Sequence, residues 1–268
     1  MDTASVLIIL ALAVLTQLGG LLGGFLLIWK ENFAHRLAGF LLSFAAGTLL
    51  GVTFLDLLPE TLKAARDPSS VLAYALLGII IFFVMEKLLL WRHHSHNEEE
   101  VIEHVVNAEE HVDAPALRGT HIRPLILFGD GLHNFLDGAA LALTFAVDWR
   151  LGLFTAAAIF FHEVPHNISD FAVLLHTRMA RRKVLLANVL LALPSPIGAG
   201  LALFAVERVE SALAPLLAIA AGSFLYIALA NLMPEIHHER RRRRIVAQIL
   251  LFLAGVGIMW LVGQVFPE

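Results

Sequence analysis

The chain has 268 residues, of which 58% are hydrophobic and only 16% charged, and its mean hydropathy is +0.77. An ordinary soluble domain is about 45–50% apolar and about 25% charged, so this composition excludes a water-soluble domain of this length. The absence of cysteine excludes a disulfide framework, and a net charge of −4 argues against nucleic-acid binding. The class of protein that remains is a polytopic helical membrane protein.

Several apolar stretches are long enough to cross a bilayer, which takes about 20 mostly apolar residues. Six of them are free of charge: residues 3–29, 37–55, 68–85, 184–206, 211–234 and 245–267. Residues 123–147 and 151–176 have the length but carry ionisable side chains. With these two included, the sequence predicts an all-α membrane protein of eight transmembrane helices, forming a single membrane domain over residues 1–268. The first stretch is too long, and lacks the basic flank, for a cleaved signal peptide.

The distribution of Lys and Arg predicts the orientation. If the N-terminus lies outside, the outer connections carry only Lys63, Arg66, Arg150 and Arg208, and all the others of the 19 basic residues fall on the inner side. Because basic residues concentrate in cytoplasmic connections, we expect both termini outside, in the periplasm or the extracellular space.

Residues 92–121 interrupt the apolar pattern between the third and fourth predicted helices. This segment holds His93, His94, His96, His104, His111 and His121 among many acidic residues. A charged run is ordinarily a solvated linker. A tract rich in His and acid can also collect divalent metal loosely, and we expect this accessory role for a cytoplasmic loop here.

Small residues indicate close helix packing. Gly19, Gly20, Gly23 and Gly24 form two overlapping G-x-x-x-G pairs, and Gly47 and Gly51 form another. Such pairs join helices within one subunit or between two, and packing within the subunit is the preferred interpretation.

Ionisable side chains inside a membrane helix are costly and usually face a cavity or path. In residues 123–147, the i, i+4 spacing places His133 and Asp137 on one face, with Asp130 one turn earlier and Asn134 at the edge. In residues 151–176, His162, His166 and Asp170 follow at the same spacing, with Glu163 one step around. Imidazole, carboxylate and amide ligands without thiolate suit Zn(II), Fe(II), Mn(II) or similar ions. Pro165 cannot donate to the Phe161 carbonyl, which predicts a freed backbone oxygen beside the cluster.

Other predicted helices add weaker candidates for a transport path. Asp56 and Glu60 bracket Pro59, and Asn231 and Glu235 bracket Pro234 at the same spacing. By the orientation above, the first pair lies at the outer mouth and the second at the inner mouth. Each pair is equally well an ordinary helix end at the interface. Asn188 is a lone amide that suits either the path or a hydrogen bond between helices.

An enzyme is the competing interpretation. Residues 162–166 read H-E-x-x-H, which on a helix is a zinc protease motif with Glu163 as general base. Residues 136–138 read L-D-G, as in intramembrane proteases. The proline inside the motif, the reversed order of the two motifs and the unused His133, Asn134 and Asp170 weigh against an intramembrane metalloprotease.

The motifs H-N-F-L-D-G at 133–138 and H-E-V-P-H-N-I-S-D-F at 162–171 resemble the helix 4 and helix 5 signatures of the Zrt/Irt-like (ZIP) metal transporters. The second is similar to the subfamily consensus H-E-x-P-H-E-x-G-D-F. The likeness extends to residues 55–60, 85–89 and 232–235. Asn167 stands where that consensus has Glu, Ser169 where it has Gly, and Asp56 where His is frequent, which affects the expected metal preference more than the function.

The resemblance implies uptake of zinc or another divalent metal (iron, manganese or cadmium) toward the cytoplasm through a two-metal site, with no catalytic cofactor. It implies His133, Asp137 and His166 as ligands of one metal. Asn134, Glu163 and His166 would hold the neighbouring metal, with Asn188 as a further candidate. His162 and Asp130 would support the site or line the path, and His162 is also a candidate metal ligand. Asp170 is a further candidate for the transport path. The resemblance also implies a multi-pass protein of the plasma or inner membrane that pairs as a homodimer. It implies alternating access, in which a bundle containing the fourth and fifth helices moves against the other helices.

Overall fold

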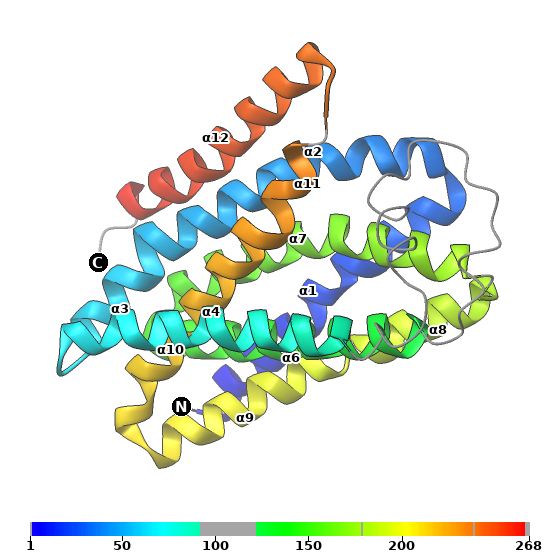
Figure 1. The fold of residues 1–268 in the computed structure, drawn as a ribbon. Helices are drawn as coiled ribbons and strands as arrows, with labels where there is room; N and C mark the ends of the chain where they lie inside the picture. The colour runs from blue at the N-terminus through cyan, green and yellow to red at the C-terminus, as the bar shows by residue number, and fades with distance from the viewer. Residues whose placement is uncertain (1, 92–121, 178, 238, 266–268) are drawn as a thin grey trace.

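The computed structural model describes residues 2–91, 122–177, 179–237 and 239–265, and over these residues the chain is helical, with no strand (Figure 1). The His- and acid-rich segment 92–121 lies outside the described residues. The helices are α1 (Thr3–Trp29), α2 (Glu31–Gly51), η1 (Val52–Leu57), α3 (Leu58–Ala64), α4 (Pro68–Trp91), α6 (Ile122–Val147), α7 (Trp149–His176), α8 (Arg181–Leu191), α9 (Pro194–Arg208), η2 (Glu210–Ala212), α10 (Leu213–Tyr226), η3 (Ile227–Leu232), α11 (Met233–His237) and α12 (Arg242–Val265).

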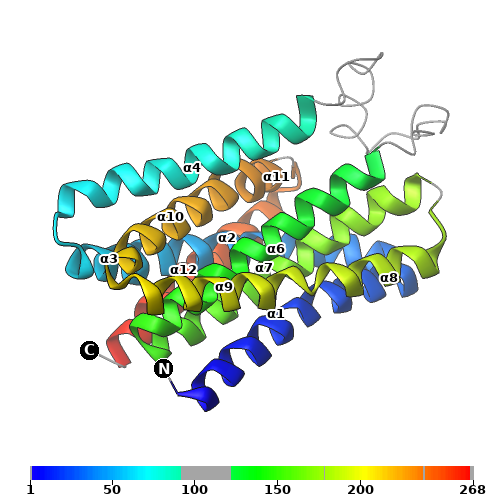
Figure 2. The same ribbon diagram turned by 90° about the horizontal axis from the view of Figure 1, so that it is seen from below.

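Six helical segments of the described residues are long and apolar enough to cross a membrane, and they coincide with the six uncharged stretches of the sequence. The remaining two, α6 and α7, have 26 and 28 residues, or about 40 Å each at 1.5 Å per residue. They lie among the other helices of the bundle (Figure 2). The prediction of an all-helical polytopic membrane protein is confirmed. α1 begins and α12 ends at one end of the bundle, whereas α4 ends and α6 begins at the other (Figure 2).

The bundle has a packed interior and an apolar outside. Large buried side chains such as Leu49, Leu141, Ile159 and Phe224 fill the space between α2, α6, α7 and α10. The outer helices α4 and α12 instead leave most of their apolar side chains uncovered, Leu72 and Leu250 among them. This surface suits a hydrocarbon surrounding, since lipid tails solvate exposed apolar side chains without cost.

Glycines permit the closest helix contacts, and they do so within the chain. α1 packs on α7 so tightly that a Cβ on Gly23 would lie 2.5 Å from the carbonyl oxygen of Val164. Close glycine–backbone contacts also join α2 to α12 at Gly47, and α4 to α10 at Gly78 and Gly222. Gly138 and Gly198 join α6 to α9 reciprocally, each meeting the backbone of the other helix. The preferred interpretation, packing within the subunit, is therefore confirmed for Gly19, Gly20, Gly23, Gly24, Gly47 and Gly51.

Two irregularities follow from prolines. The π-helical segments η1 and η3 each end two residues before a proline, Pro59 and Pro234. A proline cannot donate to the carbonyl four residues earlier and clashes with it, and a wider turn relieves both problems. In addition, the stretch 184–206, predicted as one helix, breaks at residues 192–193 into α8 and α9, immediately before Pro194 and Pro196.

Candidate metal centre

The candidate centre is formed between α6 and α7, which lie side by side through the interior of the bundle. Asp148 caps the start of α7 by accepting a hydrogen bond from the Arg150 amide at 2.8 Å. The helix then runs without interruption through Pro165, so that His162, His166 and Asp170 share the face predicted from their spacing. On α6, one face carries Asp130, His133 and Asp137. This face of α6 meets the polar face of α7.

Four side chains converge on one point, and we call them the four-ligand cluster: His133, Asp137, His162 and Glu163. The two imidazole Nε2 atoms lie 3.1 Å apart. The Asp137 Oδ2 atom lies 2.9 Å from His162 Nε2 and 3.6 Å from His133 Nε2. The Glu163 Oε1 atom lies 3.6 Å from His133 Nε2 and 3.9 Å from His162 Nε2. All four side chains are buried, His162 and Glu163 completely.

These separations match the edges of a small tetrahedron. With metal–ligand bonds of about 2.0–2.2 Å, as zinc makes with nitrogen and oxygen, tetrahedral ligands lie about 3.4 Å apart. Two buried oxygens in the cluster, Asp137 Oδ1 and Glu163 Oε1, have no hydrogen-bond partner. A buried carboxylate is costly unless it is paired or coordinates a metal. The cluster therefore fits a divalent cation by distance, by ligand type and by its unsatisfied oxygens.

A second group lies next to it along both helices, and we call it the three-ligand cluster: Asp130, His166 and Asp170. The His166 Nδ1 atom lies 3.8 Å from Asp130 Oδ1 and 3.7 Å from Asp170 Oδ2. The rings of His133 and His166 stack with centroids 4.8 Å apart and planes at 6°. The two clusters are thus in contact through one pair of imidazoles.

Amide side chains support the four-ligand cluster. Asn167 donates to Glu163 Oε2 at 2.7 Å, and Asn188 of α8 donates to Asn167 Oδ1. Gly20 of α1 makes room for this contact, because a Cβ there would collide with the Asn167 amide. Asn134 donates to the Leu191 carbonyl at 2.9 Å, whereas its buried Oδ1 atom has no hydrogen-bond partner.

The structure groups the histidines differently from the partition that the resemblance implies. His162 points into the four-ligand cluster with His133, whereas His166 belongs to the three-ligand cluster. The two histidines of the H-E-x-x-H motif therefore face different points. A zinc protease needs both on one metal, so the geometry gives the protease alternative no support.

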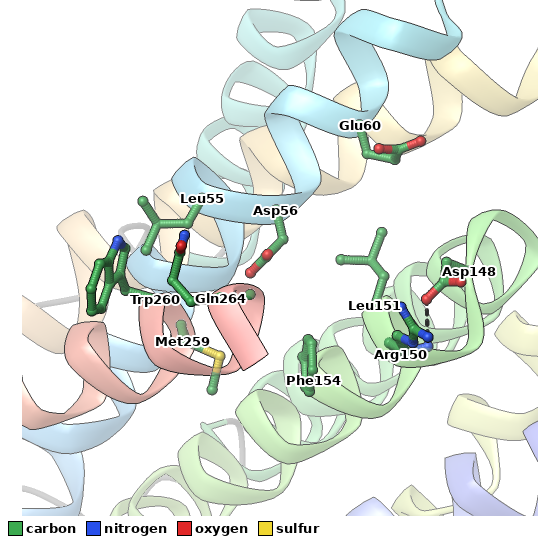
Figure 3. A pocket seen from close by; sticks show the side chains of 11 residues that line it. Leu55, Asp56, Glu60, Asp148, Arg150, Leu151, Phe154, Met259, Trp260 and Gln264 are labelled. Atoms are coloured by element: carbon green, nitrogen blue, oxygen red, sulfur yellow. Dashed lines mark hydrogen bonds between the residues drawn. The ribbon is translucent and has the colours of Figure 1, made fainter. Parts of the chain in front are cut away.

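The path candidates on either side of Pro59 lie apart from both clusters, in a pocket of about 360 Å³ (Figure 3). Asp56 and Glu60 line it together with Asp148 and Arg150 at the start of α7 and Gln264 near the end of α12. Glu60 also pairs with Lys63, with Oε2 and Nζ 3.1 Å apart. The other pair, Asn231 and Glu235, is exposed around the start of α11.

Sequence reasoning missed Asn167 as a site residue and missed the charged groups beside Asp56. Asn167 follows Glu163 by one helical turn, a spacing that could have indicated the hydrogen bond. Asp148 and Arg150 join Asp56 only through the arrangement of helices far apart in the sequence, for which the sequence offers no local signal.

Comparison with known proteins agrees with the geometry. The profile described as "ZIP Zinc transporter" matches residues 2–263. Human zinc transporter ZIP13 is 31% identical over 260 residues, covering 82% of this chain and 69% of ZIP13. The Drosophila melanogaster ZIP13 homolog is 28% identical over 291 residues, covering 90% and 81% of the two chains. Human ZIP4 is 42% identical over 135 residues, which cover 50% of this chain but only 20% of ZIP4. With a match over nearly its whole length and buried imidazoles and carboxylates arranged to bind a cation, the chain belongs to the ZIP zinc transporter family.

Proposed function

We propose that this protein moves zinc or a related divalent cation toward the cytoplasm along a path between α6 and α7. As a ZIP family member it is a metal transporter and not an enzyme, and the metal is its substrate and not a catalytic cofactor. The observation that carries the proposed path is the four-ligand cluster, whose ligand atoms lie within 4.8 Å of one another at the centre of a membrane bundle.

The order of polar groups along α7 supports a path. The pocket with Asp56 and Glu60 adjoins the start of α7 through Leu151 and Phe154. Phe154 precedes His162 by eight residues, or about 12 Å of helix rise. Asp170 follows His162 by a further eight residues, in the direction of the basic connection at residues 178–183. Because that connection is expected on the cytoplasmic side, the ion would pass from the pocket to the four-ligand cluster and then inward.

Several finer features belong to the same proposal. His133, Asp137, His162 and Glu163 bind one ion directly, and Asn134, His166 and Asn188 complete a two-metal region. Asn231 and Glu235 border the inner exit, and residues 92–121 collect metal in the cytoplasm. The protein resides in the plasma or inner membrane, with its apolar outer helices against lipid, and forms a homodimer.

Zinc flux into proteoliposomes tests this function. Purified protein is reconstituted with a zinc-sensitive dye inside the vesicles, and His133→Ala is compared with Glu207→Gln, a change of an exposed residue at the end of α9. We expect His133→Ala to abolish flux, because it removes a ligand and a corner of the tetrahedron, and Glu207→Gln to leave flux unchanged. Cleavage of a membrane peptide without zinc flux would establish the protease instead.

A further inference from the structure

We propose that Phe82 of α4 is a positioning residue for the metal centre, because its ring fixes the orientation of the His133 imidazole. A hydrogen bond between Tyr226 of α10 and Glu86 of α4 keeps the Phe82 ring in place. This inference rests on the proposed function and deepens it, since it explains how one ligand of the four-ligand cluster is held ready for a cation.

The two histidines of the four-ligand cluster are held in different ways. The Nδ1 atom of His162 lies 3.1 Å from the Ala158 carbonyl oxygen, a hydrogen bond that sets the plane of the ring while Nε2 faces the cluster. A histidine that binds a metal almost always has its second ring nitrogen bonded in this way. Among the described residues, His133 makes one hydrogen bond, and it joins Nε2 to His162 inside the cluster. The orientation of the His133 ring therefore depends on the side chains packed around it.

Three aromatic rings surround His133. The rings of His162 and His166, both on α7, have their centroids 5.2 and 4.8 Å from that of His133. The third ring is Phe82, which lies edge-to-face with His133, with centroids 6.5 Å apart and planes at 85°. Aromatic pairs attract one another in this arrangement at this separation. Phe82 is the apolar member of the three, so it supports the His133 ring without competing for the cation.

The packing of α4 on α10 places Phe82 beside the cluster. Most apolar side chains of α4 point outward, and the next residue, Phe83, is 47% exposed, whereas Phe82 is only 3% exposed. One turn earlier, Gly78 contacts the backbone of α10, and Gly222 of α10 contacts the backbone of α4. Because these glycines let the two helices approach closely, the long side chain that follows them on the same face of α4 reaches His133 of α6.

Tyr226 holds Phe82 from the side of α10. The two rings have centroids 6.0 Å apart, with planes at 40°. The Tyr226 hydroxyl donates to Glu86 Oε2 at 2.9 Å, and Glu86 follows Phe82 by one helical turn, so that Tyr226 contacts two successive turns of α4. An ionisable residue within a membrane helix is costly and is usually functional. The proposed path makes no use of Glu86, and anchoring Tyr226 gives it a role.

Zinc affinity, measured by competition with a chelator on the full-length protein in detergent, tests the inference. The part of zinc binding that His133→Ala removes belongs to the four-ligand cluster. Phe82→Leu keeps an apolar side chain but removes the ring, and it should weaken this part by about 10-fold, a loss typical of removing a group that orients a ligand. Phe83→Leu is the matched control, because it makes the same change at an exposed neighbour, and it should bind zinc as the wild type does.

Two further comparisons separate positioning from a general loss of structure. The titration curves of His133→Ala and of the Phe82→Leu/His133→Ala double variant should coincide, because no imidazole remains to be oriented. Tyr226→Phe keeps its ring and leaves no large cavity, and it should weaken zinc binding by a smaller factor than Phe82→Leu. Glu86→Gln retains an oxygen that accepts from Tyr226, so its zinc affinity should stay at the wild-type value.

The outcomes distinguish this inference from the proposed function. If Phe82→Leu and Tyr226→Phe both bind zinc with wild-type affinity, the positioning role is refuted, even where zinc flux in liposomes upholds transport. A further loss of zinc binding in the double variant would also refute it, because Phe82 would then act on something other than His133. If His133→Ala itself retains all zinc binding, the four-ligand cluster is not a zinc site, and the proposed function and this inference fail together.

Discussion

At the scale of residues, the departure from the subfamily consensus at Asn167 has a structural role. Its amide donates to Glu163 Oε2, which leaves Oε1 as the oxygen that faces the two imidazoles. Asn188 holds the other end of that amide from α8. A glutamate at position 167 would add a negative charge to the cluster, whereas the neutral amide keeps the charge of Asp137 and Glu163 matched to one divalent ion.

Because the Asn167 amide orients the Glu163 carboxylate, we expect a substitution of Asn167 to change the affinity of the four-ligand cluster for zinc. Asn167→Ala should weaken zinc binding to the four-ligand cluster by about 10–100-fold, the usual loss when a group that orients a metal ligand is removed. The measurement is competition titration with a zinc chelator of known affinity.

Ser169→Ala is the matched control for that substitution, since Ser169 is the neighbouring departure from the consensus. Its hydroxyl donates only to the Pro165 carbonyl of its own helix, at 3.3 Å, so the zinc affinity should not change. Equal affinities for the two variants would show that Asn167 does not position Glu163.

At the scale of helices, glycine contacts determine how α6 and α7 are held. Gly138 of α6 and Gly198 of α9 each accommodate the backbone of the other helix, and the glycine stripe of α1 does the same for α7. Van der Waals packing of this kind is the main force between membrane helices, because lipid supplies little hydrophobic drive. The orientation of the ligand-bearing helices thus depends on small residues distant from the ligands.

Alanine substitutions at two glycines of α9 distinguish the effect of helix packing on stability from the effect of helix propensity. Gly198→Ala should destabilise the protein by about 1–3 kcal/mol, because the new methyl group overlaps the Phe135 backbone. Gly200→Ala meets nothing within 4 Å and should be neutral or stabilise by up to about 1 kcal/mol through helix propensity. Thermal unfolding in detergent measures both, and a Gly198→Ala protein as stable as Gly200→Ala would contradict the packing argument.

At the scale of the whole molecule, the six apolar segments of the described residues, together with α6 and α7, form one bundle. The start of α1 and the end of α12 lie at the same end of this bundle (Figure 2). The connections at the opposite end carry most of the basic residues. Because Lys and Arg prefer the cytoplasmic side, we propose an orientation with both termini outside.

Cysteine labelling tests the orientation cleanly, because the chain has no cysteine of its own. Ser211→Cys, between α9 and α10, should react with a membrane-impermeant maleimide in intact cells. Ala180→Cys, before α8, should react only after permeabilisation. Both positions are exposed and both substitutions are conservative. The opposite labelling pattern would reverse the proposed direction of transport.

The sequence by itself determined the class of the fold and which side chains of α6 and α7 are candidate metal ligands. Uncharged apolar runs located six helices, and the i, i+4 ladders of α6 and α7 identified two further helices and their ligand faces, because length, hydropathy and helical period are local properties. The breaks near Pro59, Pro194 and Pro234 were less predictable, since a proline interrupts hydrogen bonding without specifying whether a helix widens or breaks.

Only the tertiary structure decided which ligands share a point. Spacing places His162 and His166 on one face of α7, but the rotation and shift of α7 against α6 assign them to different clusters. That relation depends on glycine contacts with α1 and α9, and on amides reaching across from α8, all distant in sequence. The same is true of the pocket that brings Asp56 near Arg150, because contacts between helices arise from packing and leave no periodic signal in either helix.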